Sequence, residues 1–310
     1  MIDITIPAEK RIKIAAEYYS RLTQWIDNNG YWAGLGDAKA DEMMGYIQSH
    51  AREFFLVPAD KLKTKSGEFE TKYRTERCDY KATKGDAKKS TSYGLFVLRM
   101  RSIYKDFFQE LDENGVKNGY WLMRKLGITV CPYCNRNYTI TVHSKDIQVR
   151  PDFDHFYPEA KYPSLILSFY NLVPSCPQCN HLKRVQEIEV NPWFGYKTIP
   201  RPKFKVDTAK GVFPERPFIL IDNENANTKK LGIKELYNEH TDYVKDILNK
   251  IQAYNPATYR AIVKDFQGIV NTESGLQRMI WGNYTDLAYA GKRPFAKLTA
   301  DILEQYKKYL

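Results

Sequence analysis

Apolar residues recur every three or four positions along most of the first third of the chain, which is the spacing of one face of an α-helix. In residues 8–28 this face comprises Ile12, Ala15, Tyr19, Leu22 and Ile26. The same spacing predicts further helices over 37–56, 93–111 and 118–126. We therefore expect residues 1–126 to form a helical N-terminal region with a core between its apolar faces.

The middle of the chain changes to short alternating runs that are typical of strands. The runs NYTITVHS (137–144) and IQVRPDFDHF (147–156) flank a polar turn, Ser144-Lys145-Asp146, and predict a β-hairpin. After Cys179 the sequence NHLKRVQEIEV returns to helical spacing. Residues 127–195 are thus predicted to form a strand, strand, helix core.

The last third returns to helical patterns after a connector rich in proline and aromatic residues. Short strands are predicted around 204–206 and 218–221, and helices over 231–254, 258–270, 272–281 and 295–309. No repeat of solenoid length is present. The predicted fold class is α+β, mainly helical, with regions 1–126, 127–195 and 196–310.

Charge is distributed unevenly along the chain. The formal net charge is +10, and residues 61–105 alone hold 13 basic and 5 acidic residues, a net of +8. Within this stretch, 61–92 is rich in Lys, Thr, Ser and Glu, with Phe69, Tyr73 and Tyr80 interspersed. Two interpretations stay open: a long, partly mobile insertion, or a basic arm that follows a phosphate backbone and stacks its aromatic rings on bases.

The hydropathy of the chain bears on whether the protein is membrane-bound, secreted or cytoplasmic. No run of about eighteen apolar residues occurs, so no membrane span is predicted. The first twenty residues lack the apolar segment of a secretory signal. We expect a soluble, cytoplasmic protein.

Four of the five cysteines form two C-x-x-C pairs, Cys131 with Cys134 and Cys176 with Cys179. Each pair can supply two thiolates to one side of a tetrahedral zinc ion, and two pairs complete a structural site. The alternative, two disulfides, needs an oxidising compartment that the sequence does not indicate. The fifth cysteine, Cys78, has no predicted role.

Polar residues suited to catalysis lie between and just after the cysteine pairs. They are Asp154-His155, Asn171, Asn180, and the basic pair Lys183 and Arg184. Structural interpretations exist for each: Asn171 can cap a helix over 164–170, Asn180 can cap the next helix, and His155 can be a packed core residue. Lys183 and Arg184 can be a solvated face or can contact DNA phosphates.

Taken in order, C-x-x-C, D-H-x-x-P, N-L-V-P and C-x-x-C-N-x-x-K resemble the zinc-stabilised branch of the HNH, or ββα-metal, nucleases. The resemblance implies that His155 is a general base and that Asn171 holds its ring. It implies that Asp154 and Asn180 hold one catalytic Mg²⁺ or Mn²⁺. Many members have a second His where this chain has Asn180, so the following His181 is an alternative ligand.

A second resemblance covers the last third of the chain. The phrases LGIKELYNEHTDYVKDILNK and GNYTDLAYAGKRPFAKLTADI are similar to the tails of bacterial HNH proteins encoded beside an AAA or ABC-type ATPase, as in Septu and related retron anti-phage systems. This implies an effector nuclease whose helical ends contact an ATPase partner.

The sequence therefore predicts an HNH endonuclease that hydrolyses phosphodiester bonds in DNA. Two other functions stay open. One is a zinc module that binds nucleic acid without catalysis, and the other is an adaptor that docks through its amphipathic helices. Neither alternative needs Asp154, His155 and Asn180 together. Sequence specificity and the strandedness of the target are not predicted, because the motif supplies cutting residues and no base readout.

Overall fold

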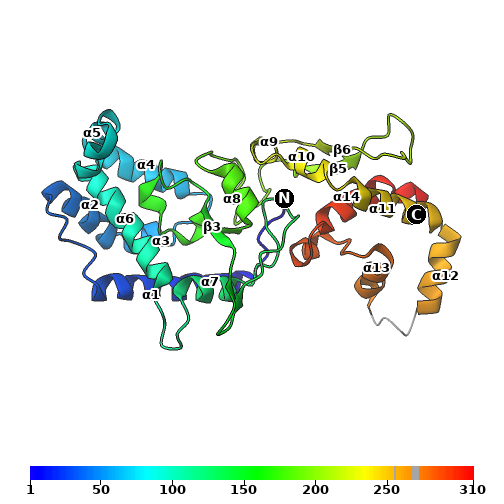
Figure 1. The fold of residues 1–310 in the computed structure, drawn as a ribbon, viewed down its shortest axis with the longest axis horizontal. Coiled ribbons are helices and arrows are strands. Elements are labelled where there is room, and N and C mark those ends of the chain that lie inside the picture. Colours follow the sequence, from blue (N-terminus) through cyan, green and yellow to red (C-terminus); the bar gives the residue numbers. More distant parts are fainter. Residues whose placement is uncertain (255, 267–271) are drawn as a thin grey trace.

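A computed structural model describes residues 1–254, 256–266 and 272–310. The fold is α+β, with many helices and small two-stranded sheets. The molecule is elongated (Figure 1). The N-terminal helices form one end, the C-terminal helices form the other, and strand β3 (Asp152–His155) and helix α8 (Pro177–Lys183) lie between them. The N-terminus itself lies near the middle of the long axis.

The N-terminal helices follow the predicted pattern. They are α1 (Ala8–Asn28), α2 (Ala38–Ser49), α3 (Ala51–Phe55), α6 (Ser92–Gln109) and α7 (Asn118–Leu126). The predicted core face of α1 is partly wrong, because Ile12 is 63% exposed. The buried row is instead Ile14, Ala15, Tyr18, Leu22 and Ile26.

The basic stretch 61–92 is folded and does not form the partly mobile insertion that was one of its two interpretations. It contains α4 (Leu62–Lys72), α5 (Arg74–Ala82) and the 3₁₀ turn η1 (Gly85–Ser90). Phe69 and Tyr73 are buried in the core, so they are not available for stacking on bases. Lysines and threonines between the apolar residues hid this helical spacing.

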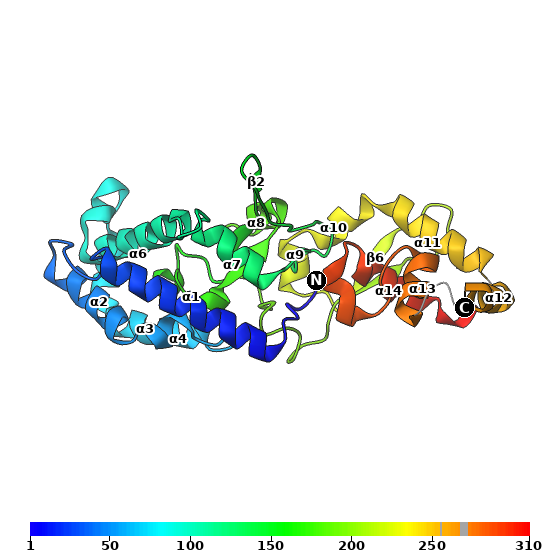
Figure 2. The same ribbon diagram turned by 90° about the horizontal axis from the view of Figure 1, so that it is seen from below.

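The central strands pair differently from the prediction. β1 (Val142–His143) and β2 (Gln148–Val149) do form a short ribbon around the predicted turn, and it projects from the body of the molecule (Figure 2). However, β3 (Asp152–His155) pairs antiparallel with β4 (Leu172–Ser175), with Asp154 opposite Val173. Pro151 separates β2 from β3 and cannot donate a ladder hydrogen bond, which ends the first ribbon.

The connection between β3 and β4 contains two 3₁₀ turns, η2 (Pro163–Leu165) and η3 (Phe169–Asn171), where an α-helix over 164–170 was one interpretation. Helix α8 (Pro177–Lys183) follows β4 directly. Cys176 is its N-cap and Pro177 its first residue, where proline is well tolerated.

The C-terminal part contains a two-stranded sheet packed against helices. β5 (Lys203–Val206) and β6 (Ile219–Asp222) lie where short strands were predicted, and the structure pairs them antiparallel. The predicted helix 231–254 is broken near His240, and the 267–270 end of the predicted helix 258–270 lies outside the described residues. The remaining elements are α9 (Ala226–Lys230), α10 (Ile233–Asn238), α11 (Thr241–Ala253), α12 (Pro256–Phe266), α13 (Glu273–Trp281), η4 (Leu287–Lys292), α14 (Ala296–Gln305) and η5 (Lys307–Tyr309).

One connected cluster of buried apolar residues includes members of all three predicted regions, from Ile4 to Tyr306. The three regions therefore share a core. Within the described part of the chain, no helix combines the length and the apolar character needed to cross a bilayer.

Candidate metal centre and catalytic pocket

The four paired cysteines come together in the core. Cys131 and Cys134 lie on the loop after α7, and Cys176 and Cys179 lie at the start of α8. All four side chains are buried, and their sulfur atoms lie within 4.8 Å of one another. A tetrahedral zinc site with bonds near 2.3 Å needs sulfur atoms roughly 3.8 Å apart, and the Cys134 and Cys176 sulfurs are 4.0 Å apart. The cluster can hold a metal ion such as zinc.

Hydrogen bonds to sulfur support this arrangement. The backbone N–H groups of Arg136, Cys176 and Cys179 donate to the sulfurs of Cys134, Cys131 and Cys176, at 3.3, 3.4 and 3.5 Å. Such donors orient thiolate ligands. Burial raises the pKa of the Cys131 thiol. Four thiolates gathered in the core repel one another unless a cation lies among them. All five cysteines are free, which agrees with a metal cluster and not with disulfides.

The C-terminal helices pack directly on the first cysteine loop. The Tyr237 hydroxyl of α10 donates to the Cys134 carbonyl at 2.6 Å. The N–H of Phe295, just before α14, donates to the carbonyl of Asn135 at 2.7 Å. Asn135 is buried and has a positive φ of 53°, which lets the loop turn back toward the second pair of cysteines.

A pocket of about 330 Å³ opens beside this cluster. It is lined by four of the predicted site residues, Asp154 and His155 of β3, Asn180 of α8, and Arg184. Tyr104 of α6 and Glu159 complete its walls among other residues. The pocket therefore brings together side chains from the N-terminal helices, the strand pair and the helix that carries two cysteines.

The ring of His155 has a defined tautomer. Its Nε2 lies 3.0 Å from the carbonyl oxygen of Ile166. Because a carbonyl only accepts, Nε2 carries the proton in the neutral ring and Nδ1 is the basic nitrogen. Burial lowers the pKa of His155, with the Glu159 carboxylate acting in the opposite direction. The ring of Tyr104 packs against it at 4.8 Å between centroids.

The Asn171 side chain makes its hydrogen bonds with backbone groups of the neighbouring loop and none with the His155 ring. Its side-chain oxygen accepts from the N–H of Tyr157 at 2.7 Å, and its NH₂ group donates to the carbonyls of Tyr157 and Leu165, both at 3.1 Å. A buried amide must satisfy these groups, and the nearby loop offers three backbone partners. Asn171 therefore holds the loop at Leu165, and the following residue, Ile166, accepts the hydrogen bond from the His155 ring.

Asp154 is buried and already has two partners. The Tyr133 hydroxyl donates to it at 2.7 Å, and the Lys183 ammonium lies 3.0 Å from the same oxygen, Oδ2. Lys183 also donates to the carbonyl of His155 at 2.6 Å. The prediction that Lys183 contacts DNA phosphates is wrong, because its side chain is fully buried. Burial lowers the pKa of Lys183, and Asp154 opposes that shift.

Asn180 lies in the pocket and His181 does not. The Asn180 NH₂ group donates to a carboxylate oxygen of Asp152 at 3.1 Å, which leaves its own oxygen for another partner. His181 is exposed and bonds the guanidinium of Arg184 at 3.0 Å. Arg184 is exposed at the edge of the pocket, with a positive φ of 45°, a conformation that costs a non-glycine residue on the order of 1 kcal/mol.

Sequence reasoning missed Asp152, Tyr133 and Tyr104. Asp152 could have been found, since residues two apart on a strand share a face and Asp154 was already a candidate. Tyr133 lies within the first C-x-x-C loop, but nothing in its position indicates a partner. Tyr104 comes from α6, about fifty residues earlier in the chain, and only the fold brings it to His155.

A second cation would find few ligands in this pocket. Among the described residues, the cysteine cluster is the only group in which three or more His, Cys, Asp or Glu side chains meet at ligand distance. The pocket contains Asp154, whose two oxygens both lie within 3.1 Å of the Lys183 ammonium, and the oxygen of Asn180.

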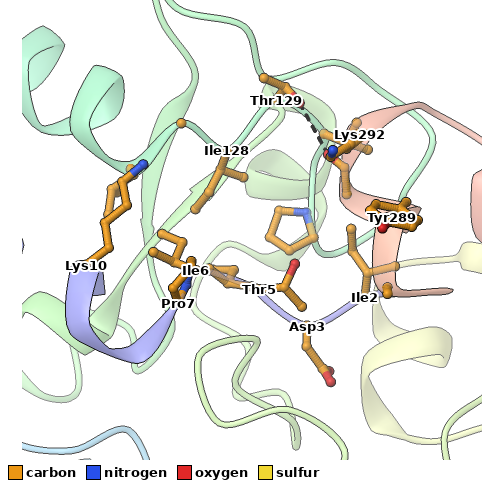
Figure 3. Close-up of a pocket in the computed structure, with 17 residues that line it drawn as sticks. Ile2, Asp3, Thr5, Ile6, Pro7, Lys10, Ile128, Thr129, Tyr289 and Lys292 are labelled. Atoms are coloured by element: carbon orange, nitrogen blue, oxygen red, sulfur yellow. Dashed lines mark hydrogen bonds between the residues drawn. The ribbon is translucent and has the colours of Figure 1, made fainter. Parts of the chain in front are cut away.

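Another cavity, of about 340 Å³, lies between residues 2–7, the loop 126–132 and residues 288–292. Aliphatic side chains, including Ile2, Ile6 and Ile128, form much of its wall, and Lys10 and Lys292 lie on opposite sides (Figure 3). None of the predicted site residues lines it. It is separate from the pocket that contains His155.

Comparisons with known proteins give no match: no family model, curated protein or solved structure resembles this chain closely enough to be reported. The function must therefore be argued from the site itself.

Proposed function

We propose that this chain is a metal-dependent nuclease of the HNH, or ββα-metal, type that hydrolyses phosphodiester bonds in DNA. One observation carries the proposal: His155, with Nδ1 as its basic nitrogen, shares an open pocket with Asp154 and Asn180. The strands and helix that present these residues adjoin a four-cysteine cluster able to hold zinc. The motif order in the sequence supports the same assignment.

In this proposal each residue has a defined task. His155 takes a proton at Nδ1 from the attacking water, which a neutral imidazole can do near pH 7. The Ile166 carbonyl keeps the ring oriented, and the exposed guanidinium of Arg184 binds a phosphate oxygen. Asp154 and Asn180 would hold a catalytic Mg²⁺ or Mn²⁺, which supplies charge neutralisation at the phosphate and leaving oxygen.

The buried pair of Lys183 and Asp154 favours a second candidate. Lys183 compensates the charge of Asp154 without a divalent ion. This arrangement is also compatible with a zinc module that binds nucleic acid without cutting it. The two candidates differ in whether His155 and an added divalent metal matter.

Plasmid cleavage by the purified chain, with and without added Mg²⁺ or Mn²⁺, separates these candidates. We expect metal-dependent cleavage that is lost in His155→Ala at unchanged zinc content. His143→Ala, on the projecting ribbon, is the matched control and should cleave like the wild type. Equal cleavage by His155→Ala would refute the catalytic role, and DNA binding without any cleavage would favour the binding module.

We further propose that the nuclease is the effector of an anti-phage system with an ATPase partner. The two C-terminal phrases that suggest this map to α10, α11, η4 and α14. The Tyr243 hydroxyl of α11 bonds Thr299 of α14 at 2.8 Å, the Tyr237 ring of α10 packs on Phe295 just before α14, and η4 contacts α14. They therefore belong to one folded unit. Co-expression with the ATPase of such a system should give a stable complex, and separate elution of the two proteins would count against it.

A further inference from the structure

A second cleft adjoins the catalytic pocket. It has a volume of about 360 Å³ and lies between α5 and residues 160–163. Ala160 lines both cavities, so they are neighbours. Its wall carries Arg77, Tyr80 and Lys81 of α5 together with Lys161 and Tyr162. This volume lies in the range of small-ligand pockets.

The cleft carries a larger excess of positive charge than the catalytic pocket. Asp154 and Glu159 line the catalytic pocket with Arg184, and Lys183 and Arg101 pair with these two carboxylates. The cleft and its immediate contacts hold five cations against two carboxylates, Glu70 and Glu187. The cations are Lys63, Arg77, Lys81, Lys88 and Lys161. A phosphate group is therefore attracted to the cleft.

Tyrosine rings make up much of the rest of the cleft. The ring centroids of Tyr80 and Tyr93 lie 5.3 Å apart, and those of Tyr162 and Tyr157 lie 5.1 Å apart. Tyr80 and Tyr162 are only partly buried, and both line the cleft. The Lys88 ammonium lies 4.1 Å from the centre of the Tyr80 ring. Aromatic rings beside lysines form the combination that binds bases and phosphates of a single strand.

We propose that this cleft binds one nucleotide of an unpaired strand, next to the phosphodiester bound in the catalytic pocket. Tyr80 and Tyr162 contact the base, while Lys81 and Lys161 contact its phosphates. A base inside a duplex is stacked on its neighbours and cannot enter such a cleft, so the substrate class is single-stranded or locally unpaired nucleic acid. This inference rests on the proposed nuclease function, because the nucleotide in the cleft belongs to the strand whose phosphodiester lies in the catalytic pocket.

Binding of a fluorescent single-stranded thymidine oligonucleotide, measured by anisotropy without added divalent metal, tests the cleft independently of cleavage. Tyr80→Leu should weaken binding roughly 5- to 150-fold, the range for loss of one base–aromatic stack. Tyr80→Phe keeps the ring and should bind like the wild type. Wild-type binding should exceed binding of the same oligonucleotide in a blunt duplex.

The contribution of Lys81 and Lys161 can be measured separately, from the salt dependence of the binding affinity. Lys81→Ala/Lys161→Ala should reduce the slope of log affinity against log salt by about 1.4, the value for two lost phosphate contacts on a single strand. The charge-matched control is Lys210→Ala/Lys229→Ala, whose lysines are exposed on the C-terminal part; this variant should keep the slope. Zinc content and circular dichroism verify that each variant is folded.

Wild-type affinity in Tyr80→Leu, an unchanged salt slope in the double variant, or no binding by the wild type would overturn the proposal. A failure of the nuclease proposal would look different from a failure of the cleft proposal. If the chain is not a nuclease, neither the wild type nor any variant cleaves DNA, while Tyr80→Leu still loses affinity for the oligonucleotide. If only the cleft is wrong, metal-dependent cleavage depends on His155 and binding does not depend on Tyr80.

Discussion

Lys183 shows how a residue suited to binding nucleic acid can have a different role. Its ammonium lies fully buried between Asp154 and the carbonyl of His155, three residues after Asn180 on the same helix. It links α8 to the strand that carries the two candidate catalytic residues. If the cation of a buried ion pair is removed, the carboxylate is still shielded from water but no longer has an opposite charge beside it, which is strongly destabilising.

Lys183→Met is therefore expected to lower the free energy of unfolding of the zinc-loaded protein by roughly 3–5 kcal/mol. Lys183→Met/Asp154→Leu removes both charges and should recover part of that loss. Urea denaturation of the wild type, both single variants and the double variant gives the coupling energy. Additive effects of the two substitutions would show that the pair contributes no coupling.

The His155 environment predicts a pH dependence of cleavage. Burial lowers its pKa from the usual value of 6.5, so the neutral, basic form persists below pH 6.5 in the folded protein. The cleavage rate should therefore remain high down to about pH 6.5 and fall only below it. The unfolded chain binds this proton at higher pH, so the same group lowers stability as the pH falls below 6.5. A cleavage rate that already halves above pH 7 would contradict this assignment.

At the scale of elements, prediction was accurate where the signal is local. Residues 8–28 and 118–126 become α1 and α7 with the predicted ends, because uninterrupted spacing determines a helix. The partner of β3 was not predictable in this way. Its pairing with β4 depends on burial of Leu172–Ser175 across a connection of sixteen residues, 156–171. Asp154, His155 and Asn180, which were predicted to act together, line one pocket. The partners of Asn171 and Lys183 come from the tertiary fold.

Among the elements, the first turn of α8 should depend most on a bound metal, because Cys176 is the N-cap of this helix and Cys179 its third residue. Cys131→Ser should lose zinc and cooperative melting, since structural zinc contributes on the order of 10 kcal/mol to folding. Cys78→Ser is the control, because Cys78 is exposed, and should keep both. In the native, zinc-loaded chain a thiol reagent should modify Cys78 alone. Rapid modification of five thiols in that state would refute the metal cluster.

At the scale of the molecule, the central region depends on the helices around it. The Tyr18 hydroxyl of α1 donates to the Leu167 carbonyl at 2.9 Å, and the Ser168 hydroxyl donates to the Phe54 carbonyl at 2.6 Å. Both contacts cross from the N-terminal helices to the connection between β3 and β4. The boundaries 1–126, 127–195 and 196–310 divide the sequence, but the buried core crosses them.

A fragment of residues 127–195 should therefore not fold alone, even with zinc. Its buried face would be exposed without α1, α3 and α6, and a zinc site alone does not bury that apolar surface. Circular dichroism melting of the fragment with one equivalent of zinc tests this, with the whole chain as the control. A cooperative transition in the fragment would show that the central region is an independent domain.

The contacts of the first cysteine loop with Tyr237 and Phe295 make metal binding and the C-terminal helices thermodynamically linked. Any ligand that displaces α10 or α14 alters the free energy of the loop that holds Cys131 and Cys134. By reciprocity, the affinity for zinc and the affinity for such a ligand change by the same factor. Zinc affinity is thus a readout of events at the C-terminal end of the molecule, far from the pocket where phosphate would bind.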